Sequence, residues 1–293
     1  MAGKPIVAGT DGSEESLRAV DWAAREAVLR GLPLRIVSAA ALPPRMVEHH
    51  AASVSGLTTV SDMQRKERDR ALATGAERAA AVAPDLLIDT DELAGSPANA
   101  LTEAGSGASM LVVGARGIGA FTAMILGSVS RYVSTHATCP VVVVREETTA
   151  AHRQVGVGIG DPARSAAALA FAFEEAALRK ASLIAVHAWD LPYGQIAQAT
   201  WALAAPGRSS LENEAARQLD SLLAEWHAKY PDVQVSHDLV RAHPGRALVG
   251  LSARADLVVL GRHATHGALP GPGAVRHAVL NHAHGPVVTV PSS

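Results

Sequence analysis

The sequence contains a single cysteine, Cys139, among 293 residues, and only 3% of its residues are aromatic. One cysteine excludes an internal disulfide framework, and the tryptophans are too scattered to form a platform for stacking nucleic-acid bases. The net charge of only −2 disfavours a protein that binds polyanions. Because 48% of the residues are hydrophobic, the chain is not expected to be disordered, and its length allows two domains with separate cores.

Long apolar runs are also missing. No stretch approaches the roughly 20 uninterrupted apolar residues that a membrane-spanning helix needs. Residues 1–10 enter a strand-like run without the apolar region of a signal peptide. We therefore expect a soluble, cytoplasmic protein that binds neither membrane nor nucleic acid. Cys139 precedes a strand and is expected to be a small buried residue rather than a reactive thiol.

Short apolar runs alternate with helical patterns in the first half of the chain. Apolar residues recur at helical spacing over 17–28, behind a turn signal at 11–13 and before a stop at Gly31. The charged segment 62–82 predicts an exposed helix, and Pro97 suits the first turn of a short one. Five strands are expected between these helices, at residues 5–10, 34–40, 85–93, 108–114 and 140–145. The alternation predicts a parallel sheet with helices on both faces and ligands at the carboxyl ends of its strands.

The second half of the chain repeats the first. The two closing blocks match best, because residues 256–261 correspond to 109–114 and residues 282–288 correspond to 136–142. A short polar linker near residues 146–153 separates the copies. We therefore predict two similar domains, residues 1–147 and 148–293.

A glycine-rich stretch, residues 114–128, lies between a buried strand and an amphipathic helix. Glycine lets the backbone approach an anion closely, and a helix start offers unpaired N–H groups and a partial positive charge. The alternative is a tight connector whose glycines serve only the turn. That alternative explains neither Ser128 at the helix start nor Asp11 at a neighbouring strand end. The sequence therefore favours a phosphate-binding loop.

These residues resemble the universal stress protein family, in its tandem form with two domains in one chain. The resemblance rests on Asp11, Gly12 and Ser13, on Gly95, Ser96 and Pro97, and above all on Gly114 and Gly117 followed after nine residues by Gly127 and Ser128. It covers essentially the whole chain. It implies an α/β fold of two tandem Rossmann-like domains, each with a five-stranded parallel sheet of order 3-2-1-4-5 and helices on both faces. It also implies an intramolecular pseudo-dimer paired through the fifth strands, and it leaves a homodimer open.

The same resemblance implies that the protein binds ATP, with or without Mg²⁺. The hydroxyl groups at the helix start and the charge of Arg116 suit a phosphate, although Asp11 could also serve only the turn and Arg116 could be solvated. Carried over position by position, the residues expected around the nucleotide are Gly9, Thr10, Asp11, Ala39, Val113, Gly114, Arg116, Gly117, Gly127, Ser128, Val129 and Ser130.

The second domain departs from this pattern. Without a gap, Thr10 and Asp11 correspond to Ile159 and Gly160, so the acidic position is glycine unless Asp161 is shifted back by one. Its loop is one residue shorter and contains two prolines, which lack N–H donors. We expect this domain to bind nucleotide weakly or not at all, and an anion site made by Arg262, His263 and His266 remains an alternative. The histidines of the second half lack the spacing of a metal site. In the loop of the second domain, Ala264 corresponds to Gly117 and Ala274 corresponds to Ser128.

The expected function is therefore that of an ATP-binding stress or regulatory protein, with nucleotide mainly in domain 1 and an unknown protein partner. An enzyme is not expected, because the loop contains no acidic residue to hold Mg²⁺ or orient water, and Asp11 is expected at the adenosine end. A slow ATPase or nucleotide-dependent transferase is one alternative. The other is an interaction scaffold that binds no nucleotide.

Overall fold

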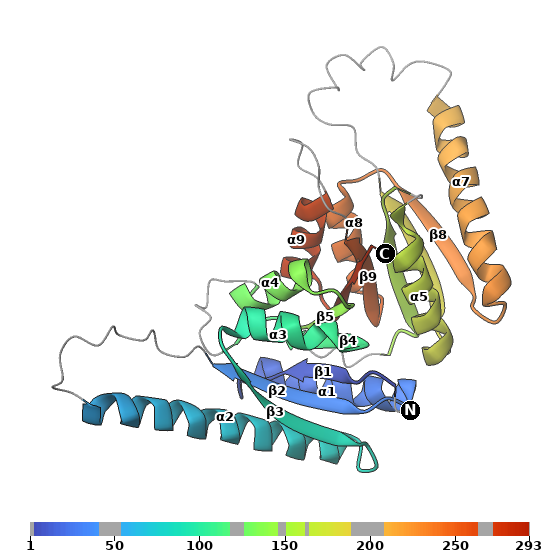
Figure 1. The fold of residues 1–293 in the computed structure, drawn as a ribbon. Helices are drawn as coiled ribbons and strands as arrows, with labels where there is room; N and C mark the ends of the chain where they lie inside the picture. Colours follow the sequence, from blue (N-terminus) through green and yellow to red (C-terminus); the bar gives the residue numbers. More distant parts are fainter. Residues whose placement is uncertain are drawn as a thin grey trace, which may run out of the picture. The chain divides into compact units, whose positions relative to one another are not determined.

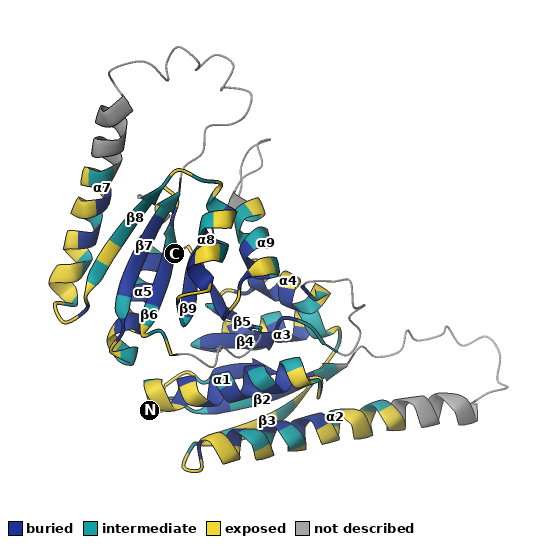
Figure 2. Cartoon of the chain, turned by 180° about the vertical axis from the view of Figure 1, so that it is seen from behind, coloured by how far each residue is buried: buried dark blue, intermediate teal, exposed yellow. Residues whose placement is uncertain are grey.

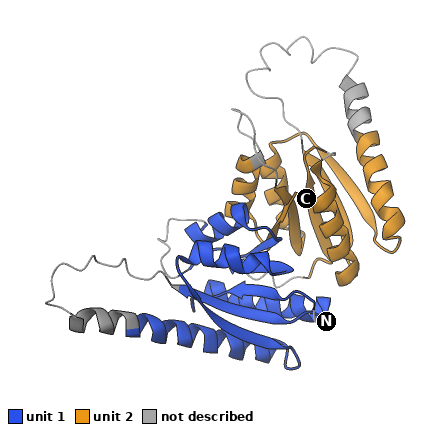
Figure 3. Ribbon diagram, in the orientation of Figure 1, with its two compact units in different colours: residues 1–147 blue, residues 148–293 orange. Residues whose placement is uncertain are grey.

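The computed structural model describes residues 3–40, 54–117, 126–145, 151–161, 164–188, 208–262 and 272–292. The chain divides into two compact units, residues 1–147 and 148–293 (Figure 3). Each unit is an α/β domain built around a parallel sheet (Figure 1). Within the described ranges, no helix is both long and apolar enough to cross a membrane.

The sheet of the first unit has the order β3-β2-β1-β4-β5. Its strands pair in parallel, so their carboxyl ends lie at one edge of the sheet. Every residue of β1, β4 and β5 is buried, which matches their continuous apolar runs. The predicted strand order is therefore confirmed. The strands are β1 (Ile6–Gly9), β2 (Leu34–Ala40), β3 (Ile88–Ala94), β4 (Met110–Gly114) and β5 (Val141–Val144).

Helices cover both faces of this sheet. Helices α1 (Glu14–Arg30) and α2 (Val54–Val82) pack against each other on one face. Helices α3 (Pro97–Ser106) and α4 (Ser128–His136) pack together on the other. The start of α1 is capped by Ser13, and its end by Gly31 in the left-handed conformation, as the sequence pattern indicated.

Helix α2 is longer than the sequence predicts. Residues 54–61 were expected to belong to an aperiodic connection, but they are helical. This stretch is rich in β-branched residues, which lowers its helix propensity. Once residues 62–82 form a helix, extension costs far less than nucleation, and no proline stops it. Residues 41–53 of the same expected connection lie outside the described ranges.

The second unit repeats this topology. Its sheet has the order β10-β9-β6-β7-β8, which is the same order read from the fifth strand to the third. Helices α5 and α7 lie on one face, and α8 and α9 on the other. The elements are β6 (Gln154–Ile159), α5 (Ala166–Arg179), β7 (Ser182–Ala188), α7 (Arg208–Lys229), β8 (Val235–Val240), α8 (Pro244–Ser252), β9 (Leu257–Arg262), α9 (Pro272–His282) and β10 (Val287–Pro291).

Each core lies between the central strands and the helices that cover them (Figure 2). Both first helices also carry a buried glutamate paired with an arginine one turn later, Glu26 with Arg30 in α1 and Glu175 with Arg179 in α5. Cys139 is buried, as expected. The two domains thus share not only their strand order but also a buried ion pair in the first helix.

Candidate functional site

A cavity of about 250 Å³ lies at the carboxyl ends of β1, β2 and β4. The strand order reverses direction between β1 and β4, and ligands of open α/β sheets bind at such a point. The volume is close to the lower end of the roughly 300–1,000 Å³ typical of small-molecule pockets. Its lining includes every residue that the sequence suggested for nucleotide binding: Gly9, Thr10, Asp11, Ala39, Val113, Gly114, Arg116, Gly117, Gly127, Ser128, Val129 and Ser130.

Four further residues line the cavity, namely Ser16, Val37, Pro97 and Leu101. Leu101 packs directly against Gly9, since a Cβ at Gly9 would lie 3.0 Å from Leu101 Cδ2. Val37 pairs with Gly9 across β1 and β2. These apolar residues of β2 and α3 form one side of the cavity, whereas α4 and the residues after β1 supply polar groups.

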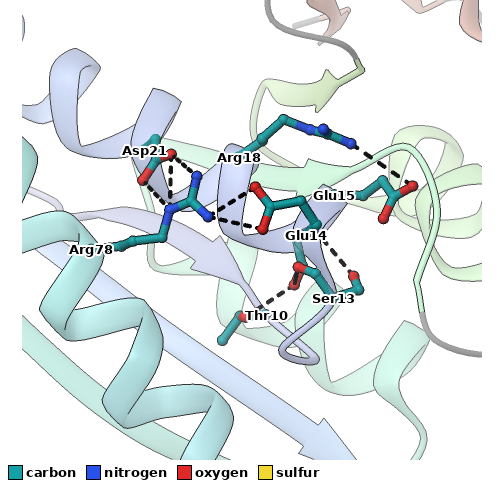
Figure 4. Close-up of polar contacts among 8 residues, drawn as sticks. Thr10, Ser13, Glu14, Glu15, Arg18, Asp21 and Arg78 are labelled. Atoms are coloured by element: carbon teal, nitrogen blue, oxygen red, sulfur yellow. Dashed lines mark hydrogen bonds and ion pairs between the residues drawn. The ribbon is translucent and has the colours of Figure 1, made fainter.

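Residues 10–13 form a tight turn after β1, here called the Asp11 turn. Asp11 Oδ1 accepts hydrogen bonds from the Ser13 N–H at 3.0 Å and from the Ser13 hydroxyl at 2.6 Å. Gly12 has a φ of +82°, a conformation that favours glycine. The turn role of Asp11 is therefore present in the structure. Figure 4 shows Thr10 and Ser13 beside the first turn of α1.

The carboxylate of Asp11 also reaches the glycine loop. Its Oδ2 lies so close to Gly117 that a Cβ at this position would overlap it. Gly114 is equally confined, because its Cβ would lie 2.7 Å from the carbonyl oxygen of Glu15. Glycine at these two positions thus allows the end of β4 and the following loop to meet the start of α1.

The first turn of α4 presents backbone N–H groups to the cavity. The first hydrogen bond of the helix runs from the Arg131 N–H to the Gly127 carbonyl at 3.0 Å, so the N–H groups of residues 128–130 precede it. Among the described residues, no side chain caps this helix start. The Ser130 hydroxyl donates to the Gly114 carbonyl at 2.6 Å. A ligand would therefore meet the backbone of Ser130 rather than a free hydroxyl proton.

Arg116 is the cation among the lining residues that the structure describes, and it is not simply solvated. Its Nη2 lies 3.5 Å from Glu15 Oε1, and the same oxygen lies 3.8 Å from Arg18 Nη2. Glu15 therefore shares its charge between two arginines (Figure 4 shows Glu15 and Arg18). Residues 118–125, most of the segment between Gly117 and Gly127, lie outside the described ranges.

The universal stress protein family model matches this chain twice, over residues 3–145 and 152–291. The chain belongs to the universal stress protein family. It is 36% identical over 306 residues to a universal stress protein of Mycobacterium tuberculosis, covering 98% of this chain and 97% of the relative. A universal stress protein of Mycolicibacterium smegmatis is 35% identical over 299 residues, covering 97% and 96% of the two chains. The fold also matches a solved universal stress protein of Archaeoglobus fulgidus over the full length of both chains, with 16% identity and a TM-score of 0.70.

The second universal stress protein unit keeps the frame of this site. A Cβ at Gly158 would lie 3.0 Å from Leu248 Cδ1 and 3.2 Å from Leu260 Cδ2, as Gly9 faces Leu101 and Val113 in the first unit. Gly158 pairs with Val186 of β7 as Gly9 pairs with Val37 of β2. This equivalence places Ile159 where the first unit has Thr10, and Gly160 where it has Asp11.

The first turn of α9 differs as well. Val133 and Val279 are fully buried at matching places in α4 and α9, which places Arg276 where the first unit has Ser130. Partial burial lowers the pKa of Arg276 below its usual value. Among the described residues Arg276 has no ion pair. His263, Ala264 and His266, which the sequence comparison names, and Pro270, one of the two prolines of this loop, lie outside the described ranges.

Proposed function

We propose that this universal stress protein is a cytoplasmic regulatory protein that binds an adenine nucleotide, foremost ATP, in its first domain. The observation that carries the proposal is the lining of a single cavity. It combines an apolar side from β2 and α3 with a glycine-lined helix start and an arginine. The apolar side suits a flat nucleobase. The helix start and the arginine suit a phosphate chain.

The nucleobase would lie on the apolar side, against Val37, Ala39 and Leu101. The phosphates would lie at the start of α4, where the N–H groups of residues 128–130 precede the first helical hydrogen bond. Arg116 would add a positive charge there, in competition with its contact to Glu15. This orientation agrees with the ligand contacts implied by the family resemblance.

The proposed role is binding rather than catalysis. Among the described residues of the lining, Asp11 is the one carboxylate, and one of its oxygens already accepts two hydrogen bonds from Ser13. Phosphoryl transfer usually requires acidic Mg²⁺ ligands and a group that orients the nucleophile. Any Mg²⁺ would therefore arrive with the nucleotide and be held mainly by its phosphates. The nucleotide would set the conformation of domain 1, and thereby the choice of a protein partner.

The second domain is proposed to bind nucleotide weakly or not at all. Ile159 offers no hydroxyl and Gly160 no carboxylate, and Ala274 replaces the serine of the signature. We therefore expect one tight nucleotide site per chain. A homodimer stays a prediction, which sedimentation analysis would test.

The test is to purify the full chain, identify any co-purifying nucleotide, and titrate the stripped protein with ATP by isothermal calorimetry. The wild type should bind one ATP tightly, and saturating ATP should raise its unfolding temperature. Gly117→Glu should remove this binding, because its side chain would collide with the Asp11 carboxylate and repel it. The matched control is Ala264→Glu, the corresponding change in the second domain, which should leave ATP binding intact.

Three results would contradict the proposal in separate ways. A wild type that carries no adenine nucleotide and shows no thermal shift with millimolar ATP would favour a nucleotide-free scaffold. Two tight sites per chain would refute the weak second domain. Multiple-turnover release of phosphate at rates typical of kinases, about 1–100 per second, would show that the site is catalytic.

A further inference from the structure

Two buried hydroxyl groups connect the whole Asp11 turn to the start of α1. Thr10 Oγ1 and Ser16 Oγ are 3.1 Å apart. The Gly12 N–H donates to Thr10 Oγ1 at 3.2 Å, and the Asp11 N–H donates to Ser16 Oγ at 3.3 Å. Ser16 Oγ donates to the Ser13 carbonyl at 2.8 Å. Only 5% of Thr10 and 4% of Ser16 is exposed, so water is a poor substitute for these bonds.

The direction of the central hydrogen bond follows from counting protons. A hydroxyl carries one proton, and that of Ser16 is donated to the Ser13 carbonyl. Thr10 must therefore donate its own proton to Ser16 Oγ, which accepts from Thr10 and from the Asp11 N–H. The hydroxyl proton of Thr10 is thus directed into the protein and not into the cavity.

We propose that Ser16 is a positioning residue of the nucleotide site, an inference that rests on the proposed function. Its hydroxyl fixes the backbone of Asp11 and the hydroxyl of Thr10. The Asp11 side chain is then set by Ser13, which completes the turn. Ser16 acts on the nucleotide through the placement of Asp11 rather than through its own proton.

The second domain supplies a natural control at the matching position. Ser165 precedes α5, only 2% of it is exposed, and its hydroxyl donates to the Asp161 carbonyl at 2.8 Å. The residue that corresponds to Thr10 is Ile159, which has no hydroxyl to join the network. Ser165 thus keeps the local backbone bond, but Gly160 at the position of Asp11 has no carboxylate for it to place.

The position of the Asp11 turn predicts which end of the nucleotide Ser16 affects. The turn follows β1, beside Val37 and Ala39, whereas the helix start and Arg116 belong to the β4 side. A loosened turn should weaken binding of adenosine and of ATP by the same factor. Loss of Arg116 should weaken ATP but leave adenosine nearly unchanged.

The experiment compares Ser16→Ala, Ser165→Ala and Arg116→Ala in the full chain. Dissociation constants for adenosine and ATP are measured by calorimetry, and unfolding is measured without nucleotide. Ser16→Ala should weaken both ligands about tenfold, since it leaves the buried Thr10 hydroxyl and the part-buried Asp11 N–H without their acceptor. Ser165→Ala should change either dissociation constant less than about twofold, although it removes a hydroxyl that is equally buried.

If Ser16→Ala does not fold, a second variant that removes a hydroxyl of the same hydrogen-bond network still tests the proposal. Thr10→Val removes the hydroxyl at nearly constant volume and should also weaken both ligands, whereas Thr10→Ser should restore binding. If the wild type binds nucleotide but Ser16→Ala or Thr10→Val binds it as Ser165→Ala does, the positioning role is refuted. A loss confined to ATP would also refute it. If the wild type binds no nucleotide, the proposed function itself fails.

Discussion

The two domains of this chain share a scaffold but not a site. Both have the same strand order, and both place a glycine of the first strand over a leucine of the third helix, Gly9 over Leu101 and Gly158 over Leu248. Both first helices bury a glutamate beside an arginine. A buried carboxylate is destabilising unless it is paired. Both domains therefore keep the arginine together with the buried glutamate.

The polar groups at the carboxyl ends of the strands differ instead. Ile159, which has no hydroxyl, stands in the place of Thr10, and Gly160, which has no side chain, stands in the place of Asp11. Arg276 occupies the place of Ser130. Strand pairing is made by the backbone, so these side-chain differences leave it intact: the Thr10 N–H donates to the Val37 carbonyl, and Ile159 pairs with His187 of β7. The comparison therefore separates the residues needed to build the domain from those that suit a ligand.

The strongest test of this separation makes domain 1 resemble domain 2. Thr10→Ile combined with Asp11→Gly should weaken ATP binding roughly 100-fold or more, about 3 kcal/mol, because it removes the turn carboxylate and the buried hydroxyl together. Calorimetric titration of the purified variant measures the effect. The reciprocal change, Ile159→Thr with Gly160→Asp, should leave the stoichiometry at one ATP per chain, since Ala274 and Arg276 remain.

Retention of ATP binding by the first double variant would show that the Asp11 turn is scaffold only. A second tight site in the reciprocal variant would show that the rest of domain 2 is still competent. Either outcome would end the distinction drawn between the two domains.

A charged cluster in domain 1, without a counterpart in the part of domain 2 that the structure describes, provides the next test. Arg78 of α2 donates from Nη2 to Asp21 Oδ2 at 2.6 Å and from Nη1 to Glu14 Oε1 at 2.9 Å (Figure 4). The hydrogen bond with Asp21 raises the pKa of Arg78 above its usual value. Only 6% of Asp21 is exposed, and its counterpart in α5 is Ala170. Arg78→Met should lower the free energy of unfolding by about 2 kcal/mol, because the buried carboxylate loses its partner while part of the site remains open to water.

Urea unfolding of the full chain measures this loss. Adding Asp21→Ala, which copies domain 2, should recover most of it. The control is Arg254→Met, which breaks an exposed pair with Asp238 and should cost less than about 0.5 kcal/mol. Equal losses in Arg78→Met and Arg254→Met would mean that burial of Asp21 does not matter.

Much of this architecture could be predicted from the sequence, because each strand is a short apolar run between strong turn signals. Strand β2 begins and ends at the predicted residues. The start of α2 could not be predicted, since residues 54–61 have little helical preference of their own. They extend the helix of residues 62–82, which follow them in the sequence. Local pattern therefore located the elements, and cooperative extension moved the start of α2. Strands β3 and β4 also begin later than the predicted residues 85 and 108, at Ile88 and Met110.

The site was predictable where a residue type signals backbone geometry, and less so where the role depends on packing. Gly114 and Gly117 are identifiable because glycine permits close approach. Ser16 was missed, since a serine in the first turn of a helix has no distinctive spacing. Only the folded structure brings its hydroxyl to Thr10 and the Asp11 backbone.

A smaller effect is expected from filling the space beside Gly114. In Gly114→Ala the new Cβ would lie 2.7 Å from the Glu15 carbonyl oxygen, so β4 and α1 would have to separate. The free energy of unfolding should fall by about 1–2 kcal/mol, and ATP should bind more weakly. Gly250→Ala in α8 is the control. No atom lies within 4 Å of its new Cβ, so it should stabilise the chain by about 0.5–1 kcal/mol. If both changes shifted the urea midpoint in the same direction, the close contact at Gly114 would not be limiting.

The smallest effect concerns the ends of the two first helices, where the scaffolds differ by one residue. Gly31 ends α1 with a φ of 63°, and Lys180 ends α5 with a φ of 50°, and each N–H bonds to the preceding turn. This left-handed conformation is easy for glycine but strained for lysine. Lys180→Gly should therefore raise the free energy of unfolding by about 0.5–1 kcal/mol, and Gly31→Lys should lower it by a similar amount. Because no atom lies within 4 Å of a Cβ at Gly31, packing does not interfere with the comparison. If urea unfolding shows the same sign for both changes, backbone strain at Lys180 is not what distinguishes the two helix ends.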